Sequence, residues 1–392
     1  MFEKLKKEFY ETFGNSDFPI KAFFVPGRVN LIGEHIDYCG GKVLPATLQM
    51  ATYAIARRSG DKIVKMRSTS KDNHVTFSTD SIKYAPENDW GNYPMGVFNE
   101  YGSKFPLLEG SEILFHGNIP GGGLSSSASL EICTALIIES LNSYPLEKDY
   151  LENRKQMAWL CQHAENTFNG VNCGIMDQAA IALGKEKKAI LMDCSNLDIS
   201  YVDMELGDYE IIIMDSCKKR TLATSKYNER RQETEQSLEI LQNHYDIKNL
   251  CDLTKSQLPQ VLEYLNGDLL KKRTRHVISE NDRVLKAYEA LKCHDLSTFG
   301  QLMNESHLSL KNDFEVTGIE LDCLYSNSVQ LPGVLGARMT GGGFGGCAIA
   351  LVHKDHCAVF KEQMEKRYTQ EIGYPPMFYS TKIGYEAKEC AL

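Results

Sequence analysis

Three glycines and three serines lie between an apolar strand and an amphipathic helix in residues 117–131, Gly-Asn-Ile-Pro-Gly-Gly-Gly-Leu-Ser-Ser-Ser-Ala-Ser-Leu-Glu. Glycine lets the backbone turn sharply and approach an anion closely, because it has no Cβ. A helix that begins at such a turn points free N–H groups and the positive end of its dipole into the loop. The stretch therefore predicts a phosphate-binding loop, and the alternative is a serine-rich cap on a core helix.

The residues on either side of this loop favour the phosphate-binding interpretation. Glu112–Phe115 has the pattern of a strand, and apolar residues from Leu130 to Leu141 recur at helical spacing. The loop has neither the Gly-Lys-Ser/Thr ending of a Walker A motif nor the Gly-x-Gly-x-x-Gly pattern of dinucleotide folds. A different class of nucleotide site is therefore indicated.

Length and composition restrict the class of protein. The 392 residues are enough for two to three domains at roughly 150 residues each. A net charge of −9 disfavours nucleic-acid binding. No apolar run approaches the roughly 20 residues that span a bilayer, and the N-terminal residues lack an apolar signal core. We expect a cytoplasmic protein with no nucleic-acid or membrane partner, whose twelve scattered cysteines are reduced thiols.

Strands and helices alternate irregularly along both halves, which predicts two α+β domains, residues 1–205 and 206–392. We expect the last strand to return to the first domain. The predicted strands include 21–25, 112–115, 188–193, 209–214, 336–340, 347–352 and 377–380. The predicted helices include 2–14, 92–102, 152–168, 225–245, 271–292, 296–310, 317–328 and 356–368.

A cluster of charged residues follows the first predicted strand. Arg28, Glu34, His35 and Asp37 lie within ten residues, beside glycine turns. Carboxylates accept hydrogen bonds from adjacent hydroxyl groups, and imidazole and guanidinium groups donate them. The cluster therefore predicts a polyol site, for which the alternative is a turn with solvated charges.

Two further carboxylates, Glu165 and Asp177, would complete a phosphoryl-transfer site. Magnesium on nucleotide phosphates needs few protein oxygens and keeps several waters, so one serine of the glycine loop and one carboxylate would suffice. A second carboxylate would face the acceptor hydroxyl. Spacing alone leaves open that Asp177 caps a helix over 178–183 and that Glu165 is an exposed helix charge.

A second glycine cluster, Gly341–Gly346, lies between two predicted strands. A hairpin turn and a second backbone surface at the phosphates are both compatible with it. The basic run 218–222, with Tyr227 beyond it, offers positive charge and a phenol, and the alternative is a solvated surface.

Together these segments resemble the GHMP small-molecule kinases and, within them, the galactokinases. Residues 27–38 are similar to the galactokinase signature, 120–128 to the nucleotide loop and 336–346 to the third motif. Similar stretches also occur at 173–178, 219–230 and 306–310, so the resemblance covers almost the whole chain.

The resemblance implies a bilobal fold with the active site between the lobes. The N-terminal lobe would be similar to ribosomal protein S5 domain 2, and the C-terminal lobe would be ferredoxin-like. The reaction would be ATP-dependent phosphorylation of D-galactose at its anomeric hydroxyl, with Mg²⁺ as cofactor. We expect a monomer or weak dimer.

The resemblance also implies residue roles. Asp177 would orient the anomeric hydroxyl and collect its proton late, with Arg28 beside it as the second catalytic residue. Ser127 and Glu165 would hold Mg²⁺. The sugar would be surrounded by Arg28, Glu34, His35, Asp37, Gly174, Asp177 and Tyr227. ATP would contact Trp90, Gly121, Gly122, Gly123, Leu124, Ser125, Ser126, Ser127 and Ala128.

Two positions depart from the commonest galactokinase pattern. Ile36 stands where threonine is frequent, and Cys39 where asparagine is frequent. The run 35–39 is also similar to the N-acetylgalactosamine kinase branch, whereas 173–177 is similar to the galactose branch. Alternatives to a galactose kinase are therefore a kinase of N-acetylgalactosamine or another galactose-like sugar, and a sensor that binds galactose and ATP without turnover.

Overall fold

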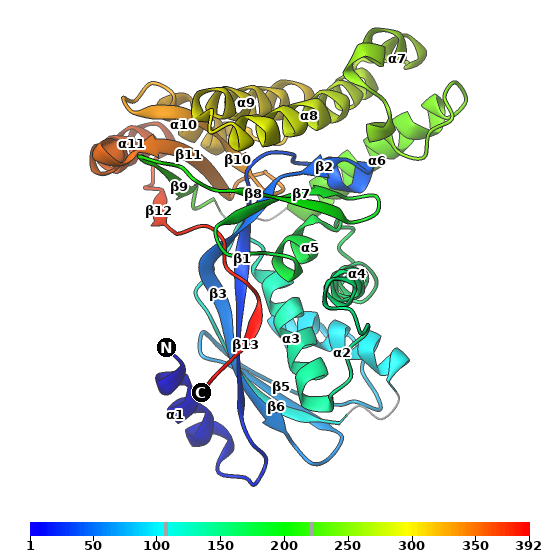
Figure 1. Ribbon diagram of the computed structural model, residues 1–392, viewed down its shortest axis with the longest axis vertical. Helices are drawn as coiled ribbons and strands as arrows, with labels where there is room; N and C mark the ends of the chain where they lie inside the picture. Colours follow the sequence, from blue (N-terminus) through cyan, green and yellow to red (C-terminus); the bar gives the residue numbers. More distant parts are fainter. Residues whose placement is uncertain (106–108, 219–222) are drawn as a thin grey trace.

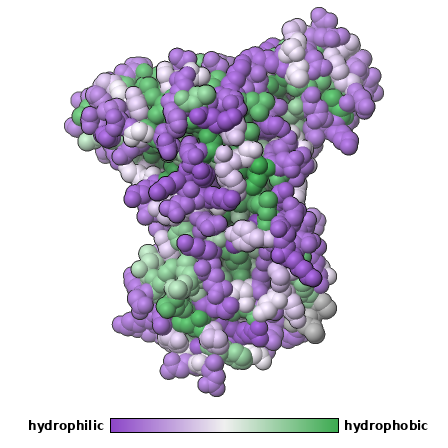
Figure 2. Space-filling model, viewed as in Figure 1, coloured by the Kyte–Doolittle hydropathy of each residue, from purple (hydrophilic) through white to green (hydrophobic). Residues whose placement is uncertain are grey.

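The computed structural model describes residues 1–105, 109–218 and 223–392, which form two lobes (Figure 1). The first lobe is built around a large sheet, and the second combines a smaller sheet with long helices. In the space-filling view the outline narrows to a waist between the lobes (Figure 2). The α+β, two-lobed architecture predicted from the sequence is confirmed. We propose 1–205 and 206–392 as its two domains, although residues 388–390 pair with the sheet of the first lobe.

The nine-stranded sheet of the first lobe has the order β13-β1-β3-β6-β4-β5, with β7 joining β3 and carrying β2 and β8. Most neighbours are antiparallel, but β4 and β6 are parallel. The strands of the first lobe are β1 (Lys21–Asn30), β2 (Lys42–Val43), β3 (Pro45–Arg58), β4 (Ile63–Ser68), β5 (Lys71–Ser78), β6 (Ser111–Gly117), β7 (Lys188–Asp193), β8 (Asp198–Asp203) and β13 (Lys388–Cys390).

Helices cover both faces of this sheet. Helix α1 (Phe2–Phe13) packs on one face, where Leu5 and Phe9 meet Ala22, Ile55 and Leu114 in a small separate core. The opposite face carries α2 (Asn92–Lys104), α3 (Ser126–Asn142), α4 (Tyr150–Thr167) and α5 (Met176–Ala182), with the short 3₁₀ segment Pro86–Gly91 before α2. The glycine loop 117–125 leads directly from β6 into α3.

The second lobe has an antiparallel sheet of order β10-β11-β9-β12. Helices α9 and α10 pack over it, and α8 packs against α9 (Figure 1). Its strands are β9 (Tyr209–Asp215), β10 (Val334–Thr340), β11 (Cys347–His353) and β12 (Met377–Ser380). Its helices are α6 (Ala223–Leu241), α7 (Leu258–Tyr264), α8 (Asp268–Lys292), α9 (Leu296–Ser309), α10 (Gly318–Ser328) and α11 (Cys357–Ile372).

The first strand is longer than predicted. Pro26-Gly27 was expected to end it, but β1 continues to Asn30 because its register with β3 shifts between Pro26 and Arg28. An irregularity of this kind tolerates the missing N–H of proline and redirects the side chains that follow. The extension is functionally important because it places Arg28 on a strand rather than in a loop.

Two further expectations concern membranes and thiols. Within the described ranges, no helix combines the length and apolar character needed to cross a bilayer. No disulfide joins any of the twelve cysteines, all of which lie in the described ranges, and those in the core pack as small apolar side chains.

Candidate active site

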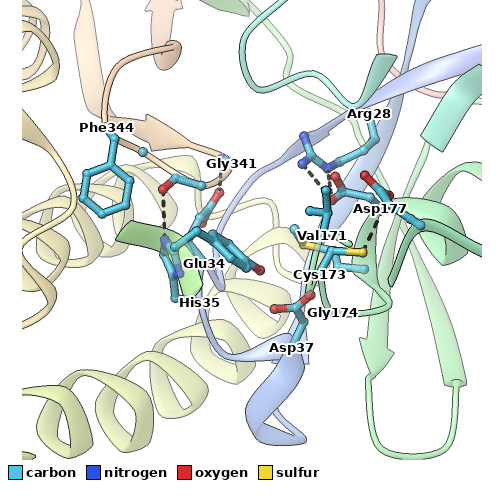
Figure 3. Close-up of a pocket in the computed structure, with 15 residues that line it drawn as sticks. Arg28, Glu34, His35, Asp37, Val171, Cys173, Gly174, Asp177, Gly341 and Phe344 are labelled. Atoms are coloured by element: carbon cyan, nitrogen blue, oxygen red, sulfur yellow. Dashed lines mark hydrogen bonds and ion pairs between the residues drawn. The ribbon is translucent and has the colours of Figure 1, made fainter. Parts of the chain in front are cut away.

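A cavity of about 210 Å³ opens where the two lobes meet (Figure 3). Its walls come from β1, the loop after β1, the segment before α5, helix α6 and the glycine turn between β10 and β11. The lining residues are Arg28, Glu34, His35, Asp37, Glu165, Val171, Cys173, Gly174, Met176, Asp177, Tyr227, Gly341, Gly342, Gly343 and Phe344. The structure thus brings together the four residues predicted to form a polyol site and the three further residues that the resemblance implies around the sugar.

Asp177 and Arg28 join this cavity to the glycine loop. Arg28 is 3% exposed, and its Nε and Nη2 lie 2.9 and 2.7 Å from Oδ1 of Asp177. Its Nη1 donates to the carbonyl of Gly123 at 2.6 Å, and the Ser125 hydroxyl donates to Oδ2 of Asp177 at 2.5 Å. Asp177 belongs to the first turn of α5, whose N-cap is Ile175, so the alternative interpretation of Asp177 as a helix cap is wrong.

Asp37 forms the floor of the cavity next to Gly174 (Figure 3). Burial, followed by the nearby Asp177 carboxylate, raises the pKa of Asp37 to about 6, against the hydrogen bonds from the backbone N–H groups of Tyr38 and Met176. A Cβ on Gly174 would lie 1.9 Å from Oδ2 of Asp37. Glycine at 174 is therefore required for the carboxylate to occupy its present position.

Glu34 is held by the second lobe. One carboxylate oxygen forms an ion pair with Arg338 of β10, and the other accepts the backbone N–H of Gly341 at 3.1 Å. Arg338 is fully buried and also donates to the carbonyls of Asn30 and Leu31. The loop that carries Glu34 is thereby fastened across the interface between the lobes.

His35 and Tyr227 form an aromatic wall. Their ring centroids are 5.2 Å apart, and Phe314 lies behind His35 at 4.9 Å. Burial lowers the pKa of His35 to about 3, so the imidazole is neutral. Its Nε2 donates to the carbonyl of Gly342 at 3.2 Å, which leaves Nδ1 to accept from the Tyr38 hydroxyl at 2.8 Å. The wall therefore presents ring faces to the cavity, because both nitrogens of His35 are already hydrogen-bonded.

Glu165 is 7% exposed, so the alternative of an exposed helix charge is wrong. Burial and the Asp177 carboxylate raise the pKa of Glu165 to about 7, against hydrogen bonds from Cys173, Gln178 and Ser127. The predicted metal pair, Ser127 and Glu165, is therefore in direct contact. No group of three metal-binding side chains occurs in the described part of the chain, but Mg²⁺ on a nucleotide needs only one or two.

The glycine loop approaches the second glycine cluster. Gly122 and Gly123 have φ angles of 104° and 126°, which suit glycine, and Leu124 and Ala128 anchor the loop in the core. A Cβ on Gly341 would lie 3.1 Å from the carbonyl oxygen of Gly123. The cluster 341–346 is a hairpin turn between β10 and β11, and it also presents its backbone beside the first loop.

Neither Trp90 nor Lys218, the described residue of the basic run, lines the cavity. Trp90 is half-buried, donates from Nε1 to Asn73 at 2.7 Å and packs edge-on against Phe115 of β6. Lys218 pairs with Glu320 at 2.9 Å. The rest of the basic run, 219–222, lies outside the described residues.

Several site residues were not singled out from the sequence. Val171 and Phe344 line the cavity, and apolar residues in loops gave no signal for this. Gln178 donates to the carboxylates of Glu131 and Glu165 in the buried region beneath the site. The burial of three polar residues of α8 could have been inferred from the sequence. His276, Glu280 and Arg283 recur at the helical spacing of its buried face.

The fold and site define the class of protein. Residues 92–185 match the GHMP kinase N-terminal domain and residues 287–370 the GHMP kinase C-terminal domain. A mevalonate kinase structure, 20% identical, superposes with a TM-score of 0.63 over 94% of this chain and 100% of its own, which is a likeness of fold. The protein is a GHMP kinase in architecture.

Similarity at higher identity identifies the family. Residues 7–58 match the galactokinase galactose-binding signature. The chain is 45% identical to a galactokinase of Clostridium acetobutylicum, covering 99% of this chain and 97% of that one. It is 44% identical to a galactokinase of Fusobacterium nucleatum over 98% of both. The crystal structure of Lactococcus lactis galactokinase complexed with galactose, 41% identical, superposes with a TM-score of 0.94 over 99% of both chains. The chain belongs to the galactokinase family.

Proposed function

We propose that this protein transfers the terminal phosphoryl group of ATP to the anomeric hydroxyl of D-galactose. The products would be galactose 1-phosphate and ADP, and the reaction would be the first step of galactose catabolism. Membership of the galactokinase family supports this assignment, and so does the likeness to a relative whose crystal structure holds galactose.

The observation that carries the proposal is the direct link between Asp177 and the glycine loop. Asp177 lines the cavity and accepts the hydroxyl of Ser125, while its partner Arg28 holds the carbonyl of Gly123. A sugar hydroxyl at Asp177 would therefore lie next to phosphates bound by the N–H groups of the loop and of α3. Such positioning contributes much of the rate in phosphoryl transfer.

Each catalytic side chain then has a defined task. Asp177 orients the attacking hydroxyl and takes its proton late, because a loose transition state needs little charge on the nucleophile. Arg28 fixes Asp177 and supplies positive charge near the transferred group. Glu34, Asp37 and the rings of His35 and Tyr227 hold the sugar.

Ser127 and Glu165 would hold Mg²⁺. They supply a hydroxyl and a carboxylate in contact, the hard oxygen ligands that this ion prefers. The pKa of Glu165, raised by burial and by Asp177, fits a carboxylate whose charge a cation would stabilise. When bound, Mg²⁺ neutralises charge on the phosphates.

The nucleotide would lie along residues 121–128, with Trp90 beside the nucleoside. Trp90 flanks β6, the strand that leads into this loop, through its contact with Phe115. The enzyme would be cytoplasmic.

ADP release should be measured with galactose, N-acetylgalactosamine, glucose, arabinose and galacturonate at matched concentrations. We expect galactose to have the highest kcat/KM, and phosphorus NMR to place the product phosphate on the anomeric carbon. A higher kcat/KM for N-acetylgalactosamine would make that sugar the substrate. Tight galactose binding without ADP formation would instead indicate a sensor.

A further inference from the structure

Three helices of the first lobe meet at a single buried amide beneath the active site. Gln178 of α5 is fully buried, and its Nε2 donates to Oε2 of Glu131 on α3 at 2.9 Å and to Oε2 of Glu165 on α4 at 2.6 Å. One amide group thus donates hydrogen bonds to two carboxyl groups. The catalytic Asp177 is the preceding residue of the same helix.

Glu131 is a buried carboxyl group outside the cavity lining. It is 0% exposed and does not line the cavity. Its other oxygen, Oε1, and the Oε1 of Gln178 make no hydrogen bond to any residue of the described ranges. Burial of an acid is unfavourable unless hydrogen bonds compensate for the lost hydration. Among the described side chains, Glu131 has one such hydrogen bond, from Gln178.

The bridge also acts on one particular oxygen of Glu165. The amide of Gln178 and the thiol of Cys173 both approach Oε2 of Glu165. Without an acceptor at position 131, the amide of Gln178 would lose one partner and be able to rotate about its terminal torsion. Glu165 would then hold one fewer fixed donor, since only Cys173 and Ser127 would remain in place beside it.

We propose that Glu131 is a positioning residue: it fixes the Gln178 amide, which in turn fixes the Glu165 carboxylate for the Mg²⁺–nucleotide complex. The inference rests on the proposed role of Glu165. Glu131 acts through its acceptor oxygen and has no need of a charge, which burial and Glu165 disfavour by raising its pKa. Partners of metal ligands commonly influence metal affinity by 10–100-fold.

The test compares Glu131→Met with Glu131→Gln. Glutamine keeps the size of the side chain and an oxygen that can accept from Gln178, whereas methionine removes the acceptor. Binding of a non-hydrolysable ATP analogue is measured by calorimetry across a range of Mg²⁺ concentrations, alongside turnover at saturating galactose. We expect Glu131→Met to raise the Mg²⁺ concentration for half-saturation by about tenfold or more, and Glu131→Gln to restore most of the affinity.

Glu139→Met is the matched structural control. Glu139 lies on the same helix, about two turns further on, and accepts from Tyr101 at 2.6 Å and Asn153 at 2.8 Å. The Glu139→Met variant should have a lower melting temperature than the parent but the same Mg²⁺ concentration for half-saturation. If Glu131→Met does not fold, Gln178→Glu is used instead, because it replaces the donor by an oxygen of similar size. This variant should also raise the Mg²⁺ concentration for half-saturation.

Glu165→Gln distinguishes the positioning role of Glu131 from the metal-binding role of Glu165. If it shifts the Mg²⁺ dependence while Glu131→Met and Gln178→Glu do not, the positioning role is overturned and the proposed function stands. Equal impairment in Glu131→Gln and Glu131→Met would also overturn it. An unchanged Mg²⁺ dependence in Glu165→Gln would overturn both the metal role and the inference.

Discussion

Arg28 directs two guanidinium nitrogens at one oxygen of Asp177, at 2.9 and 2.7 Å, which leaves the other oxygen to Ser125. The carboxylate is therefore held from the strand side and from the glycine loop at once. A sugar hydroxyl that binds Asp177 would meet a group whose orientation is already set before the substrate arrives. Preorganisation of this kind lowers the barrier without reorganisation during the reaction.

Replacement of Asp177 by asparagine should abolish turnover while sugar binding survives. The amide keeps the shape of the side chain but neither takes a proton nor pairs with Arg28 as a charge. We expect kcat to fall by at least about 10²–10⁴-fold, measured by ADP release, with galactose affinity from calorimetry changed far less. Asp203→Asn, in a surface ion pair with Lys188, is the control. A variant that keeps most of its activity would remove the proposed role of Asp177.

A methyl group at position 174 should damage the sugar site selectively. In Gly174→Ala the new Cβ would lie 1.9 Å from Oδ2 of Asp37, so the carboxylate must move from its position among the N–H groups of Tyr38 and Met176. We expect KM for galactose to rise by about tenfold or more, equivalent to about 1.4 kcal/mol, with a smaller effect on KM for ATP. In Gly102→Ala on α2 the new Cβ would have no described atom within 4 Å apart from its own helix backbone and chain neighbours, so both constants should stay unchanged. Equal effects on both substrates would argue against a local clash.

The pH dependence of the free energy of unfolding should reveal the raised pKa of Asp37. Its pKa is about 6 in the folded protein, against an ordinary value of 3.8, so folding favours the protonated form. Its contribution to stability is therefore complete below about pH 4 and is lost as pH rises through about 6, by about 3 kcal/mol at most.

Asp37→Asn removes this titration. Without sugar, the variant's free energy of unfolding relative to the parent should increase between pH 4 and pH 7, as measured by urea denaturation. Asp72→Asn, at an exposed position, should follow the parent at every pH. A constant difference between Asp37→Asn and the parent across the range would mean that Asp37 titrates normally.

Loss of Arg338 should destabilise the whole protein. The ion pair with Glu34 is buried, with side-chain exposures of 0% and 1%, so Arg338→Met leaves an uncompensated carboxylate, at a cost of about 3–5 kcal/mol. The double variant Glu34→Gln/Arg338→Met should recover part of this stability but not galactose binding. Lys354→Met, which breaks an exposed pair with Asp208, should unfold like the parent. If the double variant is no more stable than Arg338→Met, the two residues do not act as a pair.

Much of the fold could be predicted because its signals are local. The strand at 188–193 and the one at 377–380 were predicted with the bounds that the structure shows, and the long helices differ by a few residues at their ends. The predicted end of the first strand was wrong because Pro26-Gly27 is typical of a strand end. Only the pairing with β3 reveals that β1 continues.

The candidate site was partly predictable for the same reason. Arg28 to Asp37 lie close together in the sequence, so their chemistry can be seen without a structure. The Glu34–Arg338 pair joins residues 304 apart, and no local pattern assigns a partner across that separation. Glu131 was passed over because a glutamate in a helix is usually exposed, and its burial depends on the packing of α3 against α4 and α5.

The pairing of β13 with β1 joins residues 388–390 to residues 22–24, and both ends of the chain lie on the same side of the first lobe in Figure 1. During synthesis, the sheet that carries Arg28 therefore lacks this edge strand until residues 388–390 have left the ribosome. Contacts so distant in sequence close slowly. The nascent first lobe would expose the edge of β1 during that interval, which is a period when premature pairing with another strand would compete with correct folding.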